Sequence, residues 1–73
     1  MQEEEYKKIG ARIKYYRQLA ELSQSELAEN VGISAQYLSR IERGKQMPSV
    51  QVLMLIAQKL KIEVALLISN TGF

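Results

Sequence analysis

The sequence predicts an all-α fold, a compact five-helix bundle in a single domain that spans residues 1–73. One observation is that residues 23–44 have the caps and the apolar spacing of two short helices joined by a tight turn. The other is that apolar residues on both sides of this stretch recur at steps of three and four, the spacing of helices that bury one face. We expect the acidic end 1–5 and the tail 69–73 to be loose; the alternative for Phe73 is that it folds back on the core.

The first of the two short helices has clear boundaries. Ser23 and Glu26 have the spacing of a capping box, in which the hydroxyl accepts a backbone N–H and the carboxylate reaches back. The helix is therefore predicted to begin at Gln24. Gly32 ends it, because glycine enters the left-handed backbone region at little steric cost.

The second helix is capped by Ser34 and ends at Gly44, in the position where glycine is favoured. Leu38 and Ile41 mark its inner face. Since successive residues advance by about 100°, a second set of residues shares the opposite side, and none of them is a carboxylate. This outward face consists of Ala35, Gln36, Ser39, Arg40 and Arg43.

The outward face has the chemistry that reads DNA. Glutamine and arginine hydrogen-bond bidentately to adenine and guanine edges, and an alanine methyl can meet the thymine methyl. Gln36 and Arg40 are the strongest base-reading candidates, because they are four residues apart on the exposed side. Ala35 can contact a thymine methyl or serve only as a helix former. Ser39 can bond to a base or a phosphate.

The sequence resembles the helix-turn-helix family of the lambda repressor and Cro proteins, often called XRE-like. The resemblance covers roughly residues 9–68 and implies a DNA-binding transcription regulator, such as a repressor, whose recognition helix 34–44 lies in the major groove. The sequence resembles the small stand-alone members, namely phage repressors and restriction-modification controller proteins. The matching residues are Ser23-Gln24-x-Glu26-Leu27-Ala28, Val31-Gly32-Ile33-Ser34, Tyr37-Leu38-Ser39-Arg40-Ile41-Glu42-Arg43-Gly44, Pro48-Ser49 and Leu53-x-x-Ile56-Ala57-x-x-Leu60.

A second group of residues is predicted to position the DNA backbone. The N-termini of both short helices expose backbone N–H groups and a positive dipole end, which favour a phosphate oxygen. Tyr37 has an alternative role as a partly buried packing residue. The predicted phosphate contacts are Ser23, Gln24, Ser34, Tyr37, Arg43 and Lys45.

Arg17 and Glu42 are predicted to form a salt bridge. Arg17 lies beside the apolar stripe Ile9, Ile13, Tyr16 and Ala20 of a helix over 4–20, and Glu42 lies on the buried side of the recognition helix. An isolated buried charge would cost several kcal/mol, so opposite charges facing one core should pair. The family resemblance implies the same pair. The alternative is that both side chains are solvated.

Two further helices follow the loop after Gly44. Ser49 can cap a helix whose core side is marked by Val50, Leu53, Ile56, Ala57 and Leu60, and residues 64–68 form a last short helix. The resemblance implies glycine at the positions of Glu21 and Lys61, so the sequence departs from the family pattern at these two helix ends.

Composition excludes several classes of function. With no histidine and no cysteine, the chain lacks the usual metal ligands, nucleophile and general base. We therefore expect no enzyme activity, no metal and no cofactor. The acidic N-terminus and the short apolar runs indicate neither a signal peptide nor a membrane span, so a cytoplasmic protein without a membrane partner is expected. Setting aside Glu3, Glu4 and Glu5 leaves ten basic residues against five acidic ones, a balance that suits double-stranded DNA.

One such motif contacts few base pairs, so a symmetric homodimer at a palindromic operator is expected. Aliphatic residues that lie away from the predicted core mark the candidate interface, unless the core is wider than predicted. These residues are Val52, Leu55, Leu66 and Ile68. The alternative function is a protein-interaction module that uses this apolar surface and binds DNA weakly or not at all.

Overall fold

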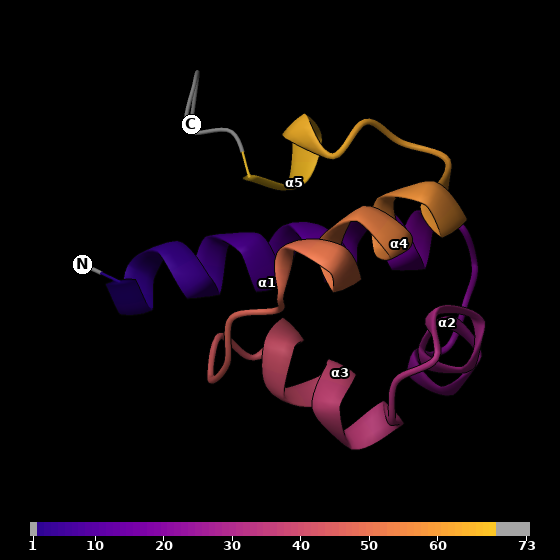
Figure 1. Ribbon diagram of the computed structural model, residues 1–73, viewed down its shortest axis with the longest axis horizontal. Coiled ribbons are helices and arrows are strands. Elements are labelled where there is room, and N and C mark those ends of the chain that lie inside the picture. The colour runs from indigo at the N-terminus through magenta and orange to yellow at the C-terminus, as the bar shows by residue number, and fades with distance from the viewer. Residues whose placement is uncertain (1, 69–73) are drawn as a thin grey trace.

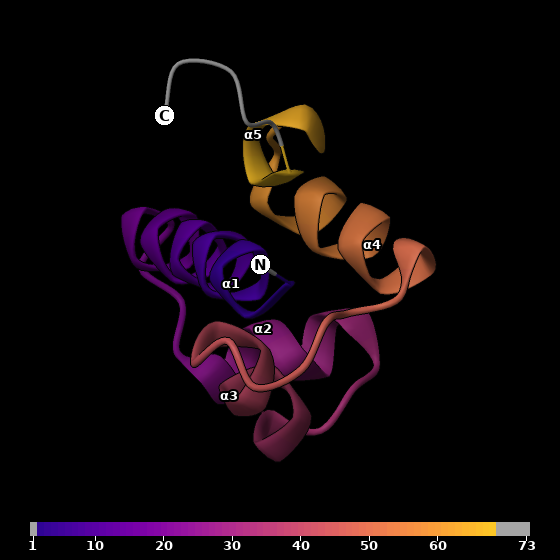
Figure 2. The same ribbon diagram turned by 90° about the vertical axis from the view of Figure 1, so that its left-hand side faces the viewer.

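The computed structural model describes residues 2–68, and all regular structure in this range is helical. The helices are α1 (Gln2–Leu19), α2 (Gln24–Val31), α3 (Ala35–Glu42), α4 (Val50–Leu60) and α5 (Ala65–Ile68), as Figure 1 shows. Figures 1 and 2 place the α2–α3 pair at one end of the molecule and α5 at the other, with α1 and α4 between them. The predicted all-α fold with five helices is confirmed.

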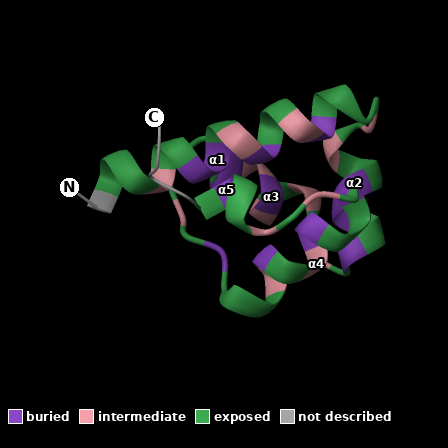
Figure 3. Cartoon of the chain, turned by 90° about the horizontal axis from the view of Figure 1, so that it is seen from above, coloured by how far each residue is buried: buried purple, intermediate pink, exposed green. Residues whose placement is uncertain are grey.

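One core joins all five helices. Buried and exposed residues alternate along α1 and α4, as Figure 3 shows, and the buried ones recur at helical spacing. The apolar core contains Ile9, Ile13, Leu27, Ala28, Val31, Leu38, Ile41, Leu53, Ile56, Ala57, Leu60 and Leu67. Within residues 2–68, no helix is both long enough and apolar enough to cross a lipid bilayer.

The first four helices end in the same way, with a residue of positive φ that turns the chain. After α2 and α3 this residue is glycine, Gly32 at 78° and Gly44 at 75°. After α1 and α4 it is Glu21 at 61° and Lys61 at 60°, the two positions where the family resemblance implies glycine. The backbone therefore keeps the left-handed turn without glycine, at a cost of about 1–2 kcal/mol for each side chain.

Gly10 brings α1 and α3 into close contact. A Cβ atom at this position would lie 2.1 Å from the carbonyl oxygen of Ile41 and 2.9 Å from that of Glu42. Only a residue without a side chain permits this approach. Gly10 therefore fixes how closely the C-terminal half of α3 is held against the rest of the protein.

Several boundaries and core positions differ from the sequence prediction. Helix α1 begins at Gln2, before the predicted position 4, and Ala20 is exposed beyond its end. Val50 was predicted in the core but is 73% exposed. Periodicity identifies the inner face of a helix but not how far neighbouring elements extend along it, and both residues lie past the ends of the shared core. Val64 precedes α5, which begins at Ala65, and Phe73 lies outside the described residues.

Candidate nucleic-acid interface

The α2–α3 pair has the predicted boundaries. At the start of α2 the backbone N–H of Ser23 donates to Glu26 Oε1 over 2.8 Å, and the Glu26 N–H donates to Ser23 Oγ over 3.0 Å, which completes the capping box. At the start of α3 the Tyr37 N–H donates to Ser34 Oγ over 3.0 Å. In both caps the serine oxygen is the acceptor, so its own O–H stays available as a donor.

The inner side of α3 is fixed by the predicted salt bridge. Arg17 donates from Nε to Glu42 Oε2 over 2.7 Å and from Nη2 to Glu42 Oε1 over 3.0 Å. The guanidinium and the carboxylate therefore form a bidentate ion pair, which is among the strong charged hydrogen-bonding arrangements. Both side chains are buried, so the alternative of two solvated charges is wrong.

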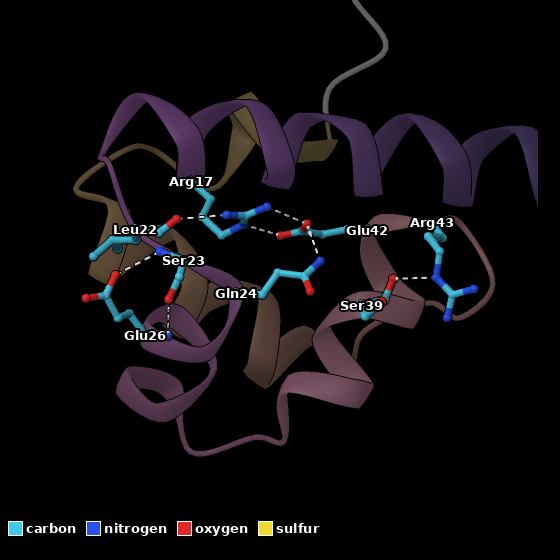
Figure 4. A network of polar contacts seen from close by, with 8 residues as sticks. All are labelled: Arg17, Leu22, Ser23, Gln24, Glu26, Ser39, Glu42 and Arg43. Carbon is cyan, nitrogen blue, oxygen red and sulfur yellow. Dashed lines mark hydrogen bonds and ion pairs between the residues drawn. The ribbon is translucent and has the colours of Figure 1, made fainter.

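Two more contacts extend this pair into a network, shown in Figure 4. Arg17 Nη1 donates to the carbonyl of Leu22 over 2.7 Å, and Gln24 Nε2 donates to Glu42 Oε1 over 2.9 Å. The network links α1, the turn before α2, α2 and α3. Because each helix is tied to the same carboxylate, α3 is held at a fixed angle to α2 and α1.

The outward side of α3 presents polar and cationic groups. Gln36 and Arg40 are exposed and one helical turn apart, and Arg43 is exposed near the helix end. Ser39 and Ala35 are half-buried, and Ala35 packs against the core. Two of the predicted base readers therefore project into solvent, while the other two lie closer to the body of the domain.

The arginines of this face are already oriented by hydrogen bonds. Arg43 Nε donates to the carbonyl of Ser39 over 3.3 Å, and Arg40 Nε donates to Gln46 Oε1 over 3.1 Å. Gln46 lies in the loop after α3, and the sequence prediction did not single it out. A loop contact of this kind leaves no periodic signal in a sequence.

The predicted phosphate contacts lie around this face, at the N-termini of α2 and α3 and at and beyond the C-terminal end of α3. Ser23, Ser34 and Lys45 are exposed, and Gln24 is half-buried because its amide is bound to Glu42. The second N–H of that amide is not needed for this bond. Tyr37 is half-buried and packs against the core, as its alternative packing role predicts.

Some of the apolar residues predicted for a dimer interface pack against the core instead. Val52 and Leu55 are half-buried and pack against the core cluster, so the core is wider around α4 than one stripe. Leu66 and Ile68 on α5 are 41% and 44% exposed. On α4 the more exposed aliphatic residues are Val50 and Met54.

A helix-turn-helix family profile matches residues 13–67, and the chain belongs to this helix-turn-helix family. The transcriptional regulator SinR of Bacillus subtilis is 46% identical over 63 residues, which are 85% of this chain and 57% of that protein. The chain spans about half of the length of the curated relatives it matches, 45% of one from Mycobacterium tuberculosis.

Solved structures agree with this assignment. The crystal structure of SinR in complex with DNA has a TM-score of 0.73 and 47% sequence identity, and the match covers 77% of this chain and 90% of that one. The restriction-modification controller protein C.AhdI of Aeromonas hydrophila has a TM-score of 0.82 at 32% identity, and the match covers 85% of this chain and 94% of that one. The fold is therefore that of helix-turn-helix DNA-binding domains, and the predicted resemblance is confirmed.

Proposed function

We propose that this chain is a sequence-specific DNA-binding transcriptional regulator, which acts by binding rather than by catalysis and places residues 34–44 in the major groove. The observation that carries the proposal is the pairing of two faces on α3. The inner face is fixed by the buried Arg17–Glu42 pair, and the outer face is a row of polar and cationic side chains without a carboxylate. Rigid support and an exposed reading face are what major-groove recognition requires.

The base-reading roles follow from side-chain chemistry. Arg40 would bind the O6 and N7 atoms of guanine, and Gln36 the N6 and N7 atoms of adenine. Ser39 would donate to a base or phosphate from the half-buried position beside them. Ala35 would meet a thymine methyl where the start of α3 approaches the groove.

The phosphate contacts would set the position of the domain on the duplex. The O–H groups of the two capping serines and the second amide N–H of Gln24 lie at helix N-termini, where the dipole favours an anion. The cations beside the reading face add charge-dependent affinity without sequence preference. The full set is Ser23, Gln24, Ser34, Tyr37, Arg43 and Lys45.

A homodimer on a palindromic operator would supply the remaining specificity, because one motif contacts too few base pairs. The proposed interface joins α4 and α5 through Val52, Leu55, Leu66 and Ile68, with the exposed Met54 beside them in sequence. Since Val52 and Leu55 also pack against the core, the exposed α5 residues would make most of the new contact.

The dimer is tested with Leu66→Glu, which places a charge in the proposed interface without entering the core. Gln18→Glu adds the same charge to the exposed side of α1 and is the matched control. Analytical ultracentrifugation should show a dimer for the wild type and for Gln18→Glu, and a monomer for Leu66→Glu. A wild-type monomer at high micromolar concentration would exclude the dimer.

The DNA-binding function is tested by selecting bound sequences from random DNA and measuring gel shifts at several salt concentrations. We expect a symmetric consensus whose half-sites are about one helical turn apart, and an affinity that falls steeply with salt. Binding of all sequences with equal affinity would exclude a sequence-specific regulator.

A further inference from the structure

The Arg40 side chain is held from outside α3. Its Nε donates to Gln46 Oε1 over 3.1 Å, and Gln46 lies in the loop between α3 and α4. Arg40 is exposed while Gln46 is half-buried. The contact is exposed, and it joins the guanidinium to a residue that is itself partly covered by the protein, which narrows the range of rotamers that Arg40 adopts.

The loop that carries Gln46 is fixed at both ends. At its start, the Lys45 N–H donates to the carbonyl of Arg40 over 2.9 Å, and Gly44 has a φ of 75°. Gly44 also packs on Lys7, because a Cβ atom there would lie 2.9 Å from the Lys7 Cα. At the end of the loop Pro48 is buried. The backbone around Gln46 is thus determined by the fold rather than by its own side chain.

This contact selects one way for Arg40 to bind a base. A guanidinium can present either its Nε and one Nη or both Nη groups as a two-donor fork. Gln46 occupies the Nε–H, so only the pair of Nη groups is left as a fork. That pair matches the O6 and N7 acceptors of guanine.

We propose that Gln46 is a positioning residue for base recognition, which holds the Arg40 guanidinium so that its two Nη groups face a guanine in the major groove. The inference rests on the proposed DNA-binding function and deepens it. Gln46 need not touch DNA itself, because it acts through the plane and direction that it imposes on Arg40. Supporting groups of this kind orient the contacting side chain and reduce the freedom lost on binding.

Two substitutions separate the hydrogen bond from the bulk of the side chain. Gln46→Met keeps the length but removes the acceptor, while Gln46→Glu keeps an acceptor oxygen and adds a negative charge. Gln58→Met, on the exposed side of α4, is the matched control for replacing glutamine by methionine. Each variant is measured on the selected site and on sites changed at single base pairs.

We expect Gln46→Met to weaken binding to the selected site about threefold to tenfold, the worth of one hydrogen bond, and to lower the preference at the Arg40 base pair alone. Gln46→Glu should keep that preference but bind every sequence more weakly, because the added negative charge repels the DNA phosphates. In an Arg40→Ala background, Gln46→Met should have no further effect on preference. An equal loss of preference at all positions, or an additive loss in the double variant, would overturn the inference.

A measurement without DNA separates this inference from the proposed function. In the free protein, the ¹⁵N-detected Nε–H signal of Arg40 should shift and exchange faster with water in Gln46→Met, and stay unchanged in Gln58→Met. An Arg40 signal that does not respond to Gln46→Met would overturn the positioning role alone. Equal binding of all sequences by the wild type would instead overturn the DNA-binding function.

Discussion

The two faces of α3 use the same kinds of side chain in opposite ways. On the inner face, the Arg17 guanidinium is buried and donates three hydrogen bonds to Glu42 and Leu22. On the outer face, the Arg40 guanidinium is exposed and donates one, to Gln46. The hydrogen bonds of Arg17 all lie within the fold, whereas Arg40 keeps N–H groups that can donate to a base edge.

This difference teaches where stability and recognition reside in a domain of this size. A buried charge pair contributes little net stability but makes each partner indispensable, since removing one leaves the other unpaired in the core. An exposed arginine contributes little to folding, so it is available for function. Substitutions on the inner face should change stability, and substitutions on the outer face should change binding.

Glu42→Ala should have the largest effect, because it leaves Arg17 buried without its partner. We expect a loss of about 3–5 kcal/mol in the free energy of unfolding, measured by urea denaturation. For 73 residues the total free energy of unfolding is only roughly 4–11 kcal/mol. At the low end of this range the variant is already unfolded at room temperature. Glu29→Ala on the exposed side of α2 is the control, with an expected change within about 0.5 kcal/mol. Equal stabilities for the two variants would contradict a structural role for the pair.

Gly10→Ala should have the next largest effect and tests how α3 is seated. The added methyl would lie 2.1 Å from the Ile41 carbonyl, so α1 and α3 must move apart. We expect a destabilisation of about 1–3 kcal/mol, even though alanine favours a helix by about 1 kcal/mol over glycine. Thermal unfolding followed by circular dichroism measures the net change, with Gln18→Ala as the control. A stabilisation by about 1 kcal/mol would mean that the two helices do not touch at Gly10.

Lys45→Ala removes a cation beside the outer face of α3 and leaves the predicted base-reading residues unchanged. Loss of one phosphate contact should weaken all DNA sequences alike and flatten the plot of log affinity against log salt by about 0.9. Gel shifts between low and physiological salt measure this slope, and Lys59→Ala on α4 is the control. A loss restricted to one sequence would instead make Lys45 a base-reading residue.

Glu21→Gly and Lys61→Gly should have the smallest effects, and they should stabilise the protein rather than destabilise it. Relief of a positive φ is worth about 1–2 kcal/mol, and the greater freedom of glycine in the unfolded chain offsets about 0.4–1 kcal/mol of this. A net gain of about 0.5 kcal/mol is expected for each, with unchanged DNA affinity. Gln58→Gly, inside α4, should lose about 1 kcal/mol. If both helix-end variants are destabilised as Gln58→Gly is, the strain argument is wrong.

The inner face of α3 was largely predictable from the sequence. The capping box at Ser23 and the glycines at 32 and 44 gave the bounds of α2 and α3, because these signals act within one turn of the chain. The Arg17–Glu42 pair was predictable because a charge on an apolar stripe needs a partner.

Features that depend on how helices meet were not predictable. The exposure of Val50 and the half-buried state of Leu55 depend on which elements lie beside α4. Gly10 stood in the sequence as an isolated glycine within a helical pattern, which can indicate close packing, but only the structure shows that α3 lies against it. The contact between Arg40 and Gln46 joins a helix to a loop and leaves no sequence pattern. The base-reading and phosphate roles stay predictions.

The most direct test of the central claim is the base preference of Arg40→Ala, measured on the selected site together with the free energy of unfolding. We predict that the preference at one base pair of each half-site falls by about 1–3 kcal/mol, while stability changes by less than about 0.5 kcal/mol. A variant that keeps the wild-type preference at every position would contradict the assignment of the outer face of α3 as the reading surface.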